Sequence, residues 1–285
     1  MKEENSLTGA KTMTHFKNFF AFLKEPFVQD IRVSDLYPLP GLNALVERFL
    51  YAVDLGAVSV ITGEVGSGKS TSLRLSTSKL HPSGYHIIAV TAHTGSVMEF
   101  IRQISIALDM DCRSPSRALL TRTIRTMITE IASRKQIPVL VIDEAHLMRI
   151  EVLAQIHTLM QFEFDSQPLM PVIMSGQNSL IDKLMYHTSR PLASRVVGKS
   201  HLEGLKLKDM KGYLKHHLEI AGIKEQLFSE EAILAIHQGS GGLLRKANNL
   251  ARGALMAAAH KSSFVVSAEH VRIASTEINR PNSGS

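Results

Sequence analysis

The stretch Ile61-Thr62-Gly63-Glu64-Val65-Gly66-Ser67-Gly68-Lys69-Ser70-Thr71, ITGEVGSGKST, decides the fold. It follows the apolar run AVSVIT (57–62), which is typical of a buried strand, and it leads into STSLRLSTSKL (70–80), which is compatible with a helix. The glycines, the lysine and the serine fit G-x-x-x-x-G-K-[ST] between a strand and a helix. Glycine adopts positive φ angles at little cost, so such a loop can wrap closely around an anion.

We therefore predict a P-loop, whose backbone N–H groups and following helix N-terminus cradle the phosphates of ATP. Lys69 is expected to reach the β- and γ-phosphates, and the Ser70 hydroxyl to ligate Mg²⁺. The residues expected to contact ATP are Gly63, Glu64, Val65, Gly66, Ser67, Gly68, Lys69, Ser70 and Thr71. A glycine-rich turn that only connects a strand to a helix is the alternative interpretation.

The composition is that of a soluble globular protein. The chain has 285 residues, of which 44% are hydrophobic and 20% charged, and both shares are ordinary. No apolar run approaches the length of a membrane span, and the first residues have no signal-peptide core. Cys112 is the single cysteine, so no internal disulfide is expected, and no Cys/His spacing indicates zinc. We predict a cytoplasmic protein without a membrane partner.

The positive charge gathers in the last third of the chain. The formal net charge is +6, and residues 205–285 carry eleven basic and seven acidic side chains, so that 11 − 7 gives +4 there. An excess of this size permits nucleic-acid binding without demonstrating it. Solvated surface lysines are an equally simple explanation.

Strands and helices alternate over the first two thirds. Strands are predicted at 57–62, 85–92, 137–145 and 170–177, with a short fifth near 199–205. This alternation predicts an α/β fold with a parallel, doubly wound sheet over residues 40–205. Among the intervening helices, one is expected to begin at Ser114-Pro115. The remainder, 206–278, is helical and forms a second, all-α domain, for which Ser229 and Ser267 are predicted N-caps.

The predicted domain organisation is as follows. Residues 1–15 form a disordered tail, and 16–205 form the α/β nucleotide-binding domain. That domain begins with the aromatic docking segment FKNFFAFLKEPF (16–27), which precedes its core. Residues 206–278 form the α-helical lid domain, and 279–285 form a second disordered tail.

A second motif, PVLVIDEAHLM (138–148), ends a buried strand in two carboxylates. The carboxyl ends of strands are where open α/β sheets place their ligands. We expect Asp143 to hold Mg²⁺ through its water shell and Glu144 to orient and polarise the attacking water. A chance acidic pair at a strand end is the alternative. His146, next to this pair, either senses the nucleotide or packs.

Further candidates lie on the later loops. Ser175, Gly176 and Gln177 are expected to emerge beside the γ-phosphate, with Gln177 holding the attacking water; a plain loop residue is the alternative. Arg190 and Arg195 precede the fifth strand, where a guanidinium can cross to the γ-phosphate of a neighbouring subunit. A surface salt bridge is the alternative for each. Arg245, behind a glycine pair, is placed to fold the helical domain onto the nucleotide.

These stretches together resemble the AAA+ ATPases, and specifically the ExeA-like group with its transposition relatives such as MuB, TnsC, TniB and IstB. The resemblance spans about residues 16–278 and is carried by FFAFLKEPF, TGEVGSGKST, VLVIDEAHLM, SGQNSL and GSGGLLRKANNLA. It implies that Lys69 and Ser70 are Walker A residues, Asp143 and Glu144 Walker B, Gln177 sensor 1 and Arg245 sensor 2. The SR pair at 194–195 favours Arg195 over Arg190 as the arginine finger. His146 stands where the group often has glutamine.

The resemblance also implies a function. ExeA-type secretion ATPases are expected to carry a membrane span and a peptidoglycan-binding region after the ATPase, and this chain ends at residue 285. We therefore expect an ATPase that forms homo-oligomers, rings or filaments, on double-stranded DNA and delivers target DNA to a transposase, with ATP hydrolysis driving disassembly.

Three other functions remain as alternatives. They are a secretion or envelope-assembly ATPase, a helicase loader or replication initiator, and a small-molecule kinase. The absence of a clear appended helix-turn-helix weakens the initiator, and the helical C-terminal domain with its GG-x-x-R pattern disfavours the kinase.

DNA contacts are expected from basic and hydroxyl side chains on and near the helix after the second strand. The candidates are Thr94, Ser96, Arg113, Arg117, Arg122 and Arg125. Such contacts go to the DNA backbone, so binding is expected to be sequence-tolerant and sensitive to salt. A solvated helix face is the alternative.

Overall fold

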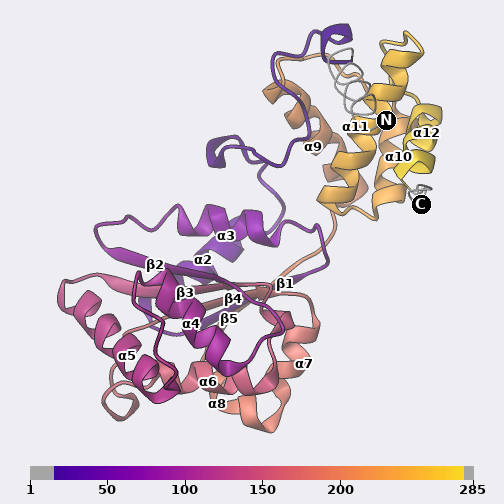
Figure 1. Ribbon diagram of the computed structural model, residues 1–285. Helices are drawn as coiled ribbons and strands as arrows, with labels where there is room; N and C mark the ends of the chain where they lie inside the picture. The colour runs from indigo at the N-terminus through magenta and orange to yellow at the C-terminus, as the bar shows by residue number, and fades with distance from the viewer. Residues whose placement is uncertain (1–15, 279–285) are drawn as a thin grey trace. The chain divides into compact units, whose positions relative to one another are not determined.

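The chain divides into two compact units (Figure 1), residues 40–202 and the residues up to Leu39 together with those from Glu203 onward. The computed structural model describes residues 16–278. The two predicted disordered tails, 1–15 and 279–285, lie outside the described residues. Each unit is described by itself below.

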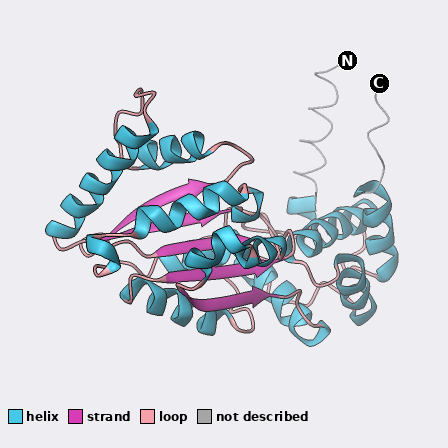
Figure 2. Ribbon diagram, turned by 90° about the horizontal axis from the view of Figure 1, so that it is seen from below, coloured by secondary structure: helices cyan, strands magenta, loops and turns pink. Residues whose placement is uncertain are grey.

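The first unit is built on a five-stranded sheet with the strand order β2-β3-β4-β1-β5. All four neighbouring pairs run parallel, which confirms the predicted parallel α/β fold. The strands are β1 (Val58–Gly63), β2 (Tyr85–Thr91), β3 (Ile137–Asp143), β4 (Val172–Gly176) and β5 (Val196–Leu202). Figure 2 shows the strands lying side by side, and in Figure 1 helices lie on both sides of the sheet.

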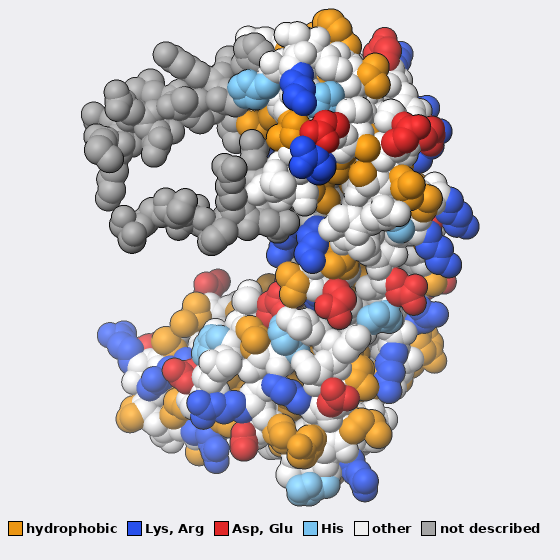
Figure 3. Space-filling view, turned by 90° about the vertical axis from the view of Figure 1, so that its right-hand side faces the viewer, with side chains coloured by type: hydrophobic (Ala, Val, Ile, Leu, Met, Phe, Trp, Pro, Cys, Tyr) orange, Lys and Arg blue, Asp and Glu red, His pale blue; other side chains and the backbone are white. Residues whose placement is uncertain are grey.

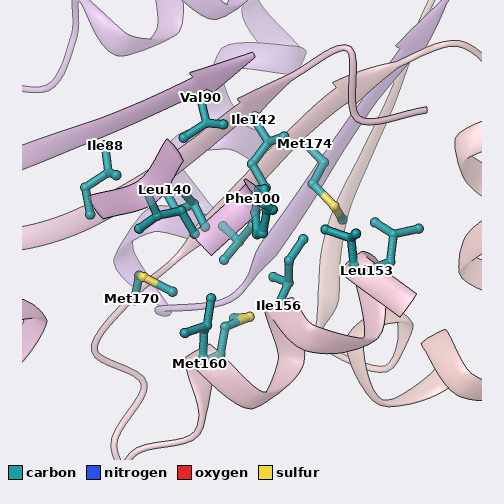
Figure 4. Packing of buried hydrophobic residues seen from close by; sticks show 14 of the residues in the cluster. Ile88, Val90, Phe100, Leu140, Ile142, Leu153, Ile156, Met160, Met170 and Met174 are labelled. Carbon is teal, nitrogen blue, oxygen red and sulfur yellow. The ribbon is translucent and has the colours of Figure 1, made fainter. Parts of the chain in front are cut away.

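The buried strands divide their side chains between two cores because successive residues point to opposite faces of a sheet. In β3, Leu140 and Ile142 belong to the core that contains Phe100 and Ile156 (Figure 4), whereas Val141 belongs to the core on the other face. The first core is covered by α4 (Val97–Ala107), α5 (Arg117–Ser133) and α6 (Ile150–Met160), and the second by α2 (Leu42–Asp54) and α3 (Lys69–Thr77). Burial on both faces explains why the central strands are mostly apolar and do not alternate apolar with exposed polar residues.

The remaining helices of this unit are short. They are α7 (Ser179–Met185) and α8 (Arg190–Ala193), which lie between β4 and β5. Helix α5 begins at Arg117, and the Ser116 side chain accepts the N–H of Leu119 at 3.3 Å. The cap is therefore Ser116 rather than the predicted Ser114, because a serine caps the helix whose second or third N–H it reaches.

The second unit packs α9 (Leu207–Ile220), α10 (Glu230–Ser240), α11 (Leu244–His260) and α12 (Ala268–Ile278) around one hydrophobic core. The aromatic segment predicted to precede the α/β domain belongs to this unit instead. Four of its side chains, Phe16, Phe20, Phe22 and Phe27, are buried among the helices. The Leu23 N–H also donates to the Ala221 carbonyl at 2.9 Å. The segment therefore completes the helical core, and the boundary after residue 205 lies closer to residue 202.

An aromatic cluster joins the N-terminal segment to α9. The ring centroids of Phe27 and His217 lie 5.1 Å apart, and those of Tyr213 and His217 4.6 Å apart. Burial lowers the pKa of His217 to about 4, with a smaller contribution from His216. His217 is therefore neutral at physiological pH and acts as a packing residue of the helical core.

None of the helices between residues 16 and 278 combines the length and hydropathy needed to cross a bilayer. On the face seen in Figure 3, basic side chains lie among acidic and apolar ones. The net positive charge is therefore not gathered into one large patch on that face.

Candidate nucleotide-binding site

The loop between β1 and α3 has the backbone of an anion cradle. Gly66 and Gly68 have φ angles of 84° and 101°, a conformation that side chains with a Cβ rarely adopt. Gly68 caps α3 without a side-chain hydrogen bond, and the helix begins at Lys69. The first N–H groups of a helix have no partner within the helix. This loop therefore presents a helix N-terminus directly after β1.

Two side chains inside the loop fit a bound phosphate. The Lys69 side chain is buried, and its Nζ donates to the carbonyls of Gly63 and Glu64 at 2.9 Å each. The Ser67 Oγ is buried without a hydrogen-bond partner, a costly arrangement unless a ligand satisfies it. A Cβ on Gly63 would lie 2.5 Å from the Ser67 Oγ, so only glycine fits there. The donors and their burial suit an anionic phosphate chain.

The other residues of the predicted ATP contacts lie at the surface of the loop or in the first turn of α3. Glu64, Val65 and Ser70 are exposed, and Thr71 is half-buried. An exposed hydroxyl in the first turn can face a ligand, as the prediction for Ser70 requires. Mg²⁺ usually takes only one or two ligands from a protein and the rest from phosphates and water. Ser70 and Asp143 are a donor set of that kind.

Asp143 is held at the end of β3 by its neighbours. Its Oδ1 accepts the Ser175 hydroxyl at 2.9 Å and the Glu144 N–H at 2.9 Å. Strands β3 and β4 pair Ile142 with Met174, which brings the next residue of each strand side by side. Ser175 is completely buried. The hydroxyl therefore fixes the Asp143 carboxylate and does not emerge toward the γ-phosphate as we predicted.

Glu144 follows directly in a strained conformation. Its φ of 54° and ψ of 30° place it in the left-handed region, which is rare for a residue with a side chain and is found at functional sites. Its side chain is 40% exposed, and its Oε2 lies 3.3 Å from the Nδ1 of His146. The backbone therefore turns the glutamate out of the strand, with one carboxylate oxygen beside a histidine ring.

Gln177 comes immediately after β4 and is half-buried. No hydrogen bond of its side chain occurs among the described residues, so its amide can bind a ligand. Gly176, the residue before it, packs against His146: a Cβ there would lie 2.9 Å from the His146 backbone nitrogen. The β4 end thus contacts the segment that carries both carboxylates.

The two candidate arginine fingers differ in their surroundings. Arg195 forms an ion pair with Asp165 and donates from Nη1 to the Pro191 carbonyl at 2.7 Å, with 20% of its side chain exposed. This hydrogen-bonded pair lowers the pKa of Asp165. Arg190 begins α8, is exposed, and forms no side-chain hydrogen bond or ion pair with the described residues. Arg195 therefore has a partner within its own subunit, whereas Arg190 does not.

Arg245 lies in the first turn of α11, in the helical unit, and is exposed. The glycine pair before it has φ angles of 59° and 77°. A Cβ on Gly242 would lie 2.3 Å from the Leu205 carbonyl oxygen. The pair therefore permits the close turn that sets the start of α11.

The predicted DNA contacts are not equivalent. Arg125 donates to the Thr158 carbonyl at 3.0 Å and lies over the Phe162 ring, 4.6 Å from its centroid. Both contacts join α5 to the end of α6, so Arg125 has a structural role. Arg117 and Arg122 are exposed and, with Arg125, line an open groove of about 700 Å³.

The other three candidates lie on loops. Thr94 is exposed in the loop after β2. Arg113 pairs with Asp111 at 3.0 Å on the surface. The Ser96 hydroxyl caps α4 by accepting the N–H of Glu99 at 3.3 Å, so it stabilises the start of that helix.

Comparisons with known proteins agree with this geometry. Residues 54–184 match the model of an AAA domain family. The Cdc6p protein of Pyrobaculum aerophilum has a similar structure, with a TM-score of 0.71 at 16% identity, over 88% of this chain and 70% of that one. Drosophila ORC bound to DNA gives a TM-score of 0.67 at 14% identity, over 94% of this chain and 66% of that one. In the sequence of residues 54–184 and in its fold, the chain is similar to AAA+ ATPases.

A sequence relative is similar over almost the whole chain. General secretion pathway protein A of Aeromonas hydrophila is 27% identical over 267 residues, which are 93% of this chain and 48% of that protein. The chain therefore spans about half the length of this relative. The similarity supports an AAA+ ATPase of the ExeA-like kind.

Two contacts of the site could not be predicted from the sequence, although Ser175 itself was a candidate for the γ-phosphate. Ser175 contacts Asp143 only because β3 and β4 are neighbours, and Lys183 of α7 donates to the carbonyls of His146 and of Met148, the latter at 2.7 Å. Neither contact has a local sequence signal. Only the strand order, read together with the DEA motif, points to Ser175.

Proposed function

We propose that this AAA+ ATPase binds ATP through residues 63–71 and hydrolyses it with Glu144 as the residue that activates water. The observation that carries this proposal is the pair Asp143-Glu144 at the end of β3, with Glu144 turned outward in a left-handed conformation. Ser70 and Asp143 are the proposed ligands of Mg²⁺. When bound, Mg²⁺ offsets negative charge on the β- and γ-phosphates. Lys69 exchanges its two loop carbonyls for phosphate oxygens, and the Ser67 hydroxyl gains the partner it lacks.

Three further residues are proposed to act on the bound nucleotide. Gln177 holds the attacking water from the end of β4. Arg195 acts from a neighbouring subunit, after it has left Asp165, and Arg190 is the competing candidate because it is exposed. Arg245 contacts the nucleotide from the helical unit, which makes that unit responsive to ATP.

We further propose that the protein oligomerises on double-stranded DNA and regulates transposition, by delivering target DNA to a transposase and activating it. Arg117 and Arg122 support the DNA part, because both are exposed along one groove and neither forms an ion pair with a described residue, although Glu163 also lines that groove. Solved structures of similar fold include ORC bound to DNA. Hydrolysis by Glu144 would then release the oligomer from DNA.

The test is fluorescence anisotropy of labelled duplex DNA with the Glu144→Gln protein in ATP, ADP or no nucleotide. We expect binding in ATP alone, tighter on longer duplexes, and weakened by added salt in proportion to the phosphates contacted. Lys69→Ala in the same background is the matched control, because it removes the charge that faces the phosphates. DNA binding that is equal in all three nucleotide conditions, or absent in ATP, contradicts the proposal.

A second function is favoured by one observation. General secretion pathway protein A is 27% identical over 93% of this chain, so an assembly ATPase of a secretion system is the alternative. Such an ATPase needs nucleotide and protein partners and no DNA. ATP-dependent self-association without any DNA affinity in the anisotropy experiment would select this alternative.

A further inference from the structure

His146 occupies an enclosed position between the candidate base and the end of β4. It lies in the single turn η2 (Ala145–Leu147), which directly follows Glu144. Its side chain is only 10% exposed, and its Nδ1 is buried without hydrogen-bond geometry to any partner. The Glu144 Oε2 lies 3.3 Å from this nitrogen. A buried ring nitrogen beside a carboxylate is expected to have a function, because leaving it unpaired costs free energy.

The backbone of His146 is fixed from two sides. Gly176 leaves no room for a side chain, since a Cβ there would lie 3.2 Å from the His146 Cβ and 3.3 Å from its Nδ1. On another side, the Lys183 ammonium donates to the carbonyls of His146 and Met148. The ring therefore has little freedom to swing away, and a small rotation of the Glu144 side chain completes a hydrogen bond.

The same contacts connect His146 to the strand that precedes Gln177. Ser175 binds the Asp143 carboxylate at 2.9 Å, and the next residue, Gly176, touches His146. Two consecutive residues of β4 therefore reach the two carboxylates of the DEA motif. Ser175 contacts Asp143 directly, and Gly176 contacts His146, which lies beside Glu144. A movement at the end of β4 would therefore displace Asp143 through the Ser175 hydroxyl and Glu144 through the His146 ring.

We propose that His146 is a positioning residue for Glu144. Its Nδ1–H donates to the Glu144 carboxylate and holds one oxygen aside, so that the other oxygen faces the attacking water. His146 touches neither ATP nor water in this role. Misplacement of a reacting group by about 1 Å can cost a hundredfold in rate, so the orientation of Glu144 affects turnover more than ATP affinity. The inference rests on the proposed role of Glu144 and is independent of DNA binding.

The test compares His146→Asn with His146→Leu in the full-length protein. Asparagine and leucine have the same branched shape, but only asparagine carries an N–H donor, at the same number of bonds from Cα as Nδ1. Single-turnover ATP hydrolysis with saturating Mg²⁺ and the Kd for ATP are measured for both. We expect about a tenfold or greater loss of rate for His146→Leu with unchanged ATP affinity. His146→Asn is expected to stay within about threefold of the parent.

The controls separate this inference from the function it rests on. His260→Ala, at an exposed histidine at the end of α11, should leave the rate unchanged. Glu144→Gln should abolish turnover while ATP stays bound. Parent-like turnover by Glu144→Gln overturns both the base assignment and the role of His146. If Glu144→Gln is inactive and His146→Leu retains the parent rate, or if Leu and Asn lose rate equally, only the positioning role is refuted.

Discussion

Acid should destabilise the helical unit through one buried histidine. Burial lowers the pKa of His217 from 6.5 to about 4, because its ring lies among Phe27 and Tyr213 rather than in water. In the unfolded chain the ring keeps its ordinary pKa and binds a proton earlier as the pH falls. Between the two values the unfolded state therefore holds more protons, and stability decreases with decreasing pH.

The size of the effect follows from the two pKa values. With 6.5 in the unfolded and about 4 in the folded state, lowering the pH from about 7.5 to about 5 should remove about 2 kcal/mol from the free energy of unfolding. The stabilisation from neutral His217 is fully present above the pKa of the ring in the unfolded chain. Its loss is complete once the pH falls below about 4, the pKa in the folded chain.

The matched variant is His217→Phe, which keeps an aromatic ring against Phe27 but cannot titrate. None of the hydrogen bonds among the described residues involves the ring nitrogens of His217, so the variant removes no such bond. The free energy of unfolding of α9 is measured in urea at pH 7.5 and 5, with pulse-labelling hydrogen exchange as the probe. This probe reports the helical unit separately from the α/β unit. We expect the variant to lose about 2 kcal/mol less than the parent over this range. Equal losses in both proteins would refute the assignment of this pH dependence to His217.

Four other substitutions test the site. Ser175→Ala removes the donor to the first Walker B carboxylate, so we expect a weaker apparent Mg²⁺ affinity in ATPase titrations and a stability loss of about 1–3 kcal/mol by thermal unfolding. Arg125→Ala should lower the thermal unfolding temperature, whereas Arg122→Ala should leave it unchanged. Arg122→Ala should instead weaken ATP-dependent DNA binding in anisotropy and reduce its dependence on salt. The reverse pattern contradicts a structural role for Arg125 and a DNA-binding role for Arg122. Asp165→Asn weakens the ion pair that holds Arg195 within its own subunit. If Arg195 acts on the nucleotide of a neighbouring subunit, the ATPase rate measured in the oligomer should rise. If Arg190 has that role, the rate should be unchanged.

The parts of the fold that follow from short-range chemistry could be predicted from the sequence. Gly66 and Gly68 are needed for positive φ angles, and the burial of β3 on both faces makes its sequence apolar from Ile137 to Ile142. Such requirements act within a few residues of the chain. For this reason the P-loop, the parallel α/β fold class and the DEA motif could all be predicted without a structure.

Contacts between distant segments could not be predicted in the same way. That Ser175 binds Asp143 depends on the pairing of β3 with β4, which periodicity does not reveal. The contacts of Arg195 with Asp165 and of Arg125 with Thr158 likewise depend on segments that are distant in the sequence and meet only on folding. Helices α7 and α8, with seven and four residues, are too short to show a clear period. Helix α6 did carry a helical pattern, at Val152, Leu153, Ile156, Leu159 and Met160, but no element was assigned there.

The placement of the aromatic segment shows a different limit. Phenylalanines at 16, 20, 22 and 27 predict that the segment docks on an apolar surface, and the structure buries them all. Apolar burial is not directional, so their spacing does not say which unit receives them. The receiving surface turned out to be formed by helices that begin at Leu207.

That arrangement has a consequence for synthesis of the protein on the ribosome. Residues 16–27 leave the ribosome early, but the helices that bury them, α9 to α12, extend to residue 278. At roughly 5–20 residues per second, the roughly 250 intervening residues take on the order of 12–50 s to be made. During that interval the α/β unit can fold, while the phenylalanines have no core to enter and remain available to chaperones. The last unit to become complete in the nascent chain is therefore the one that contains its first described residues.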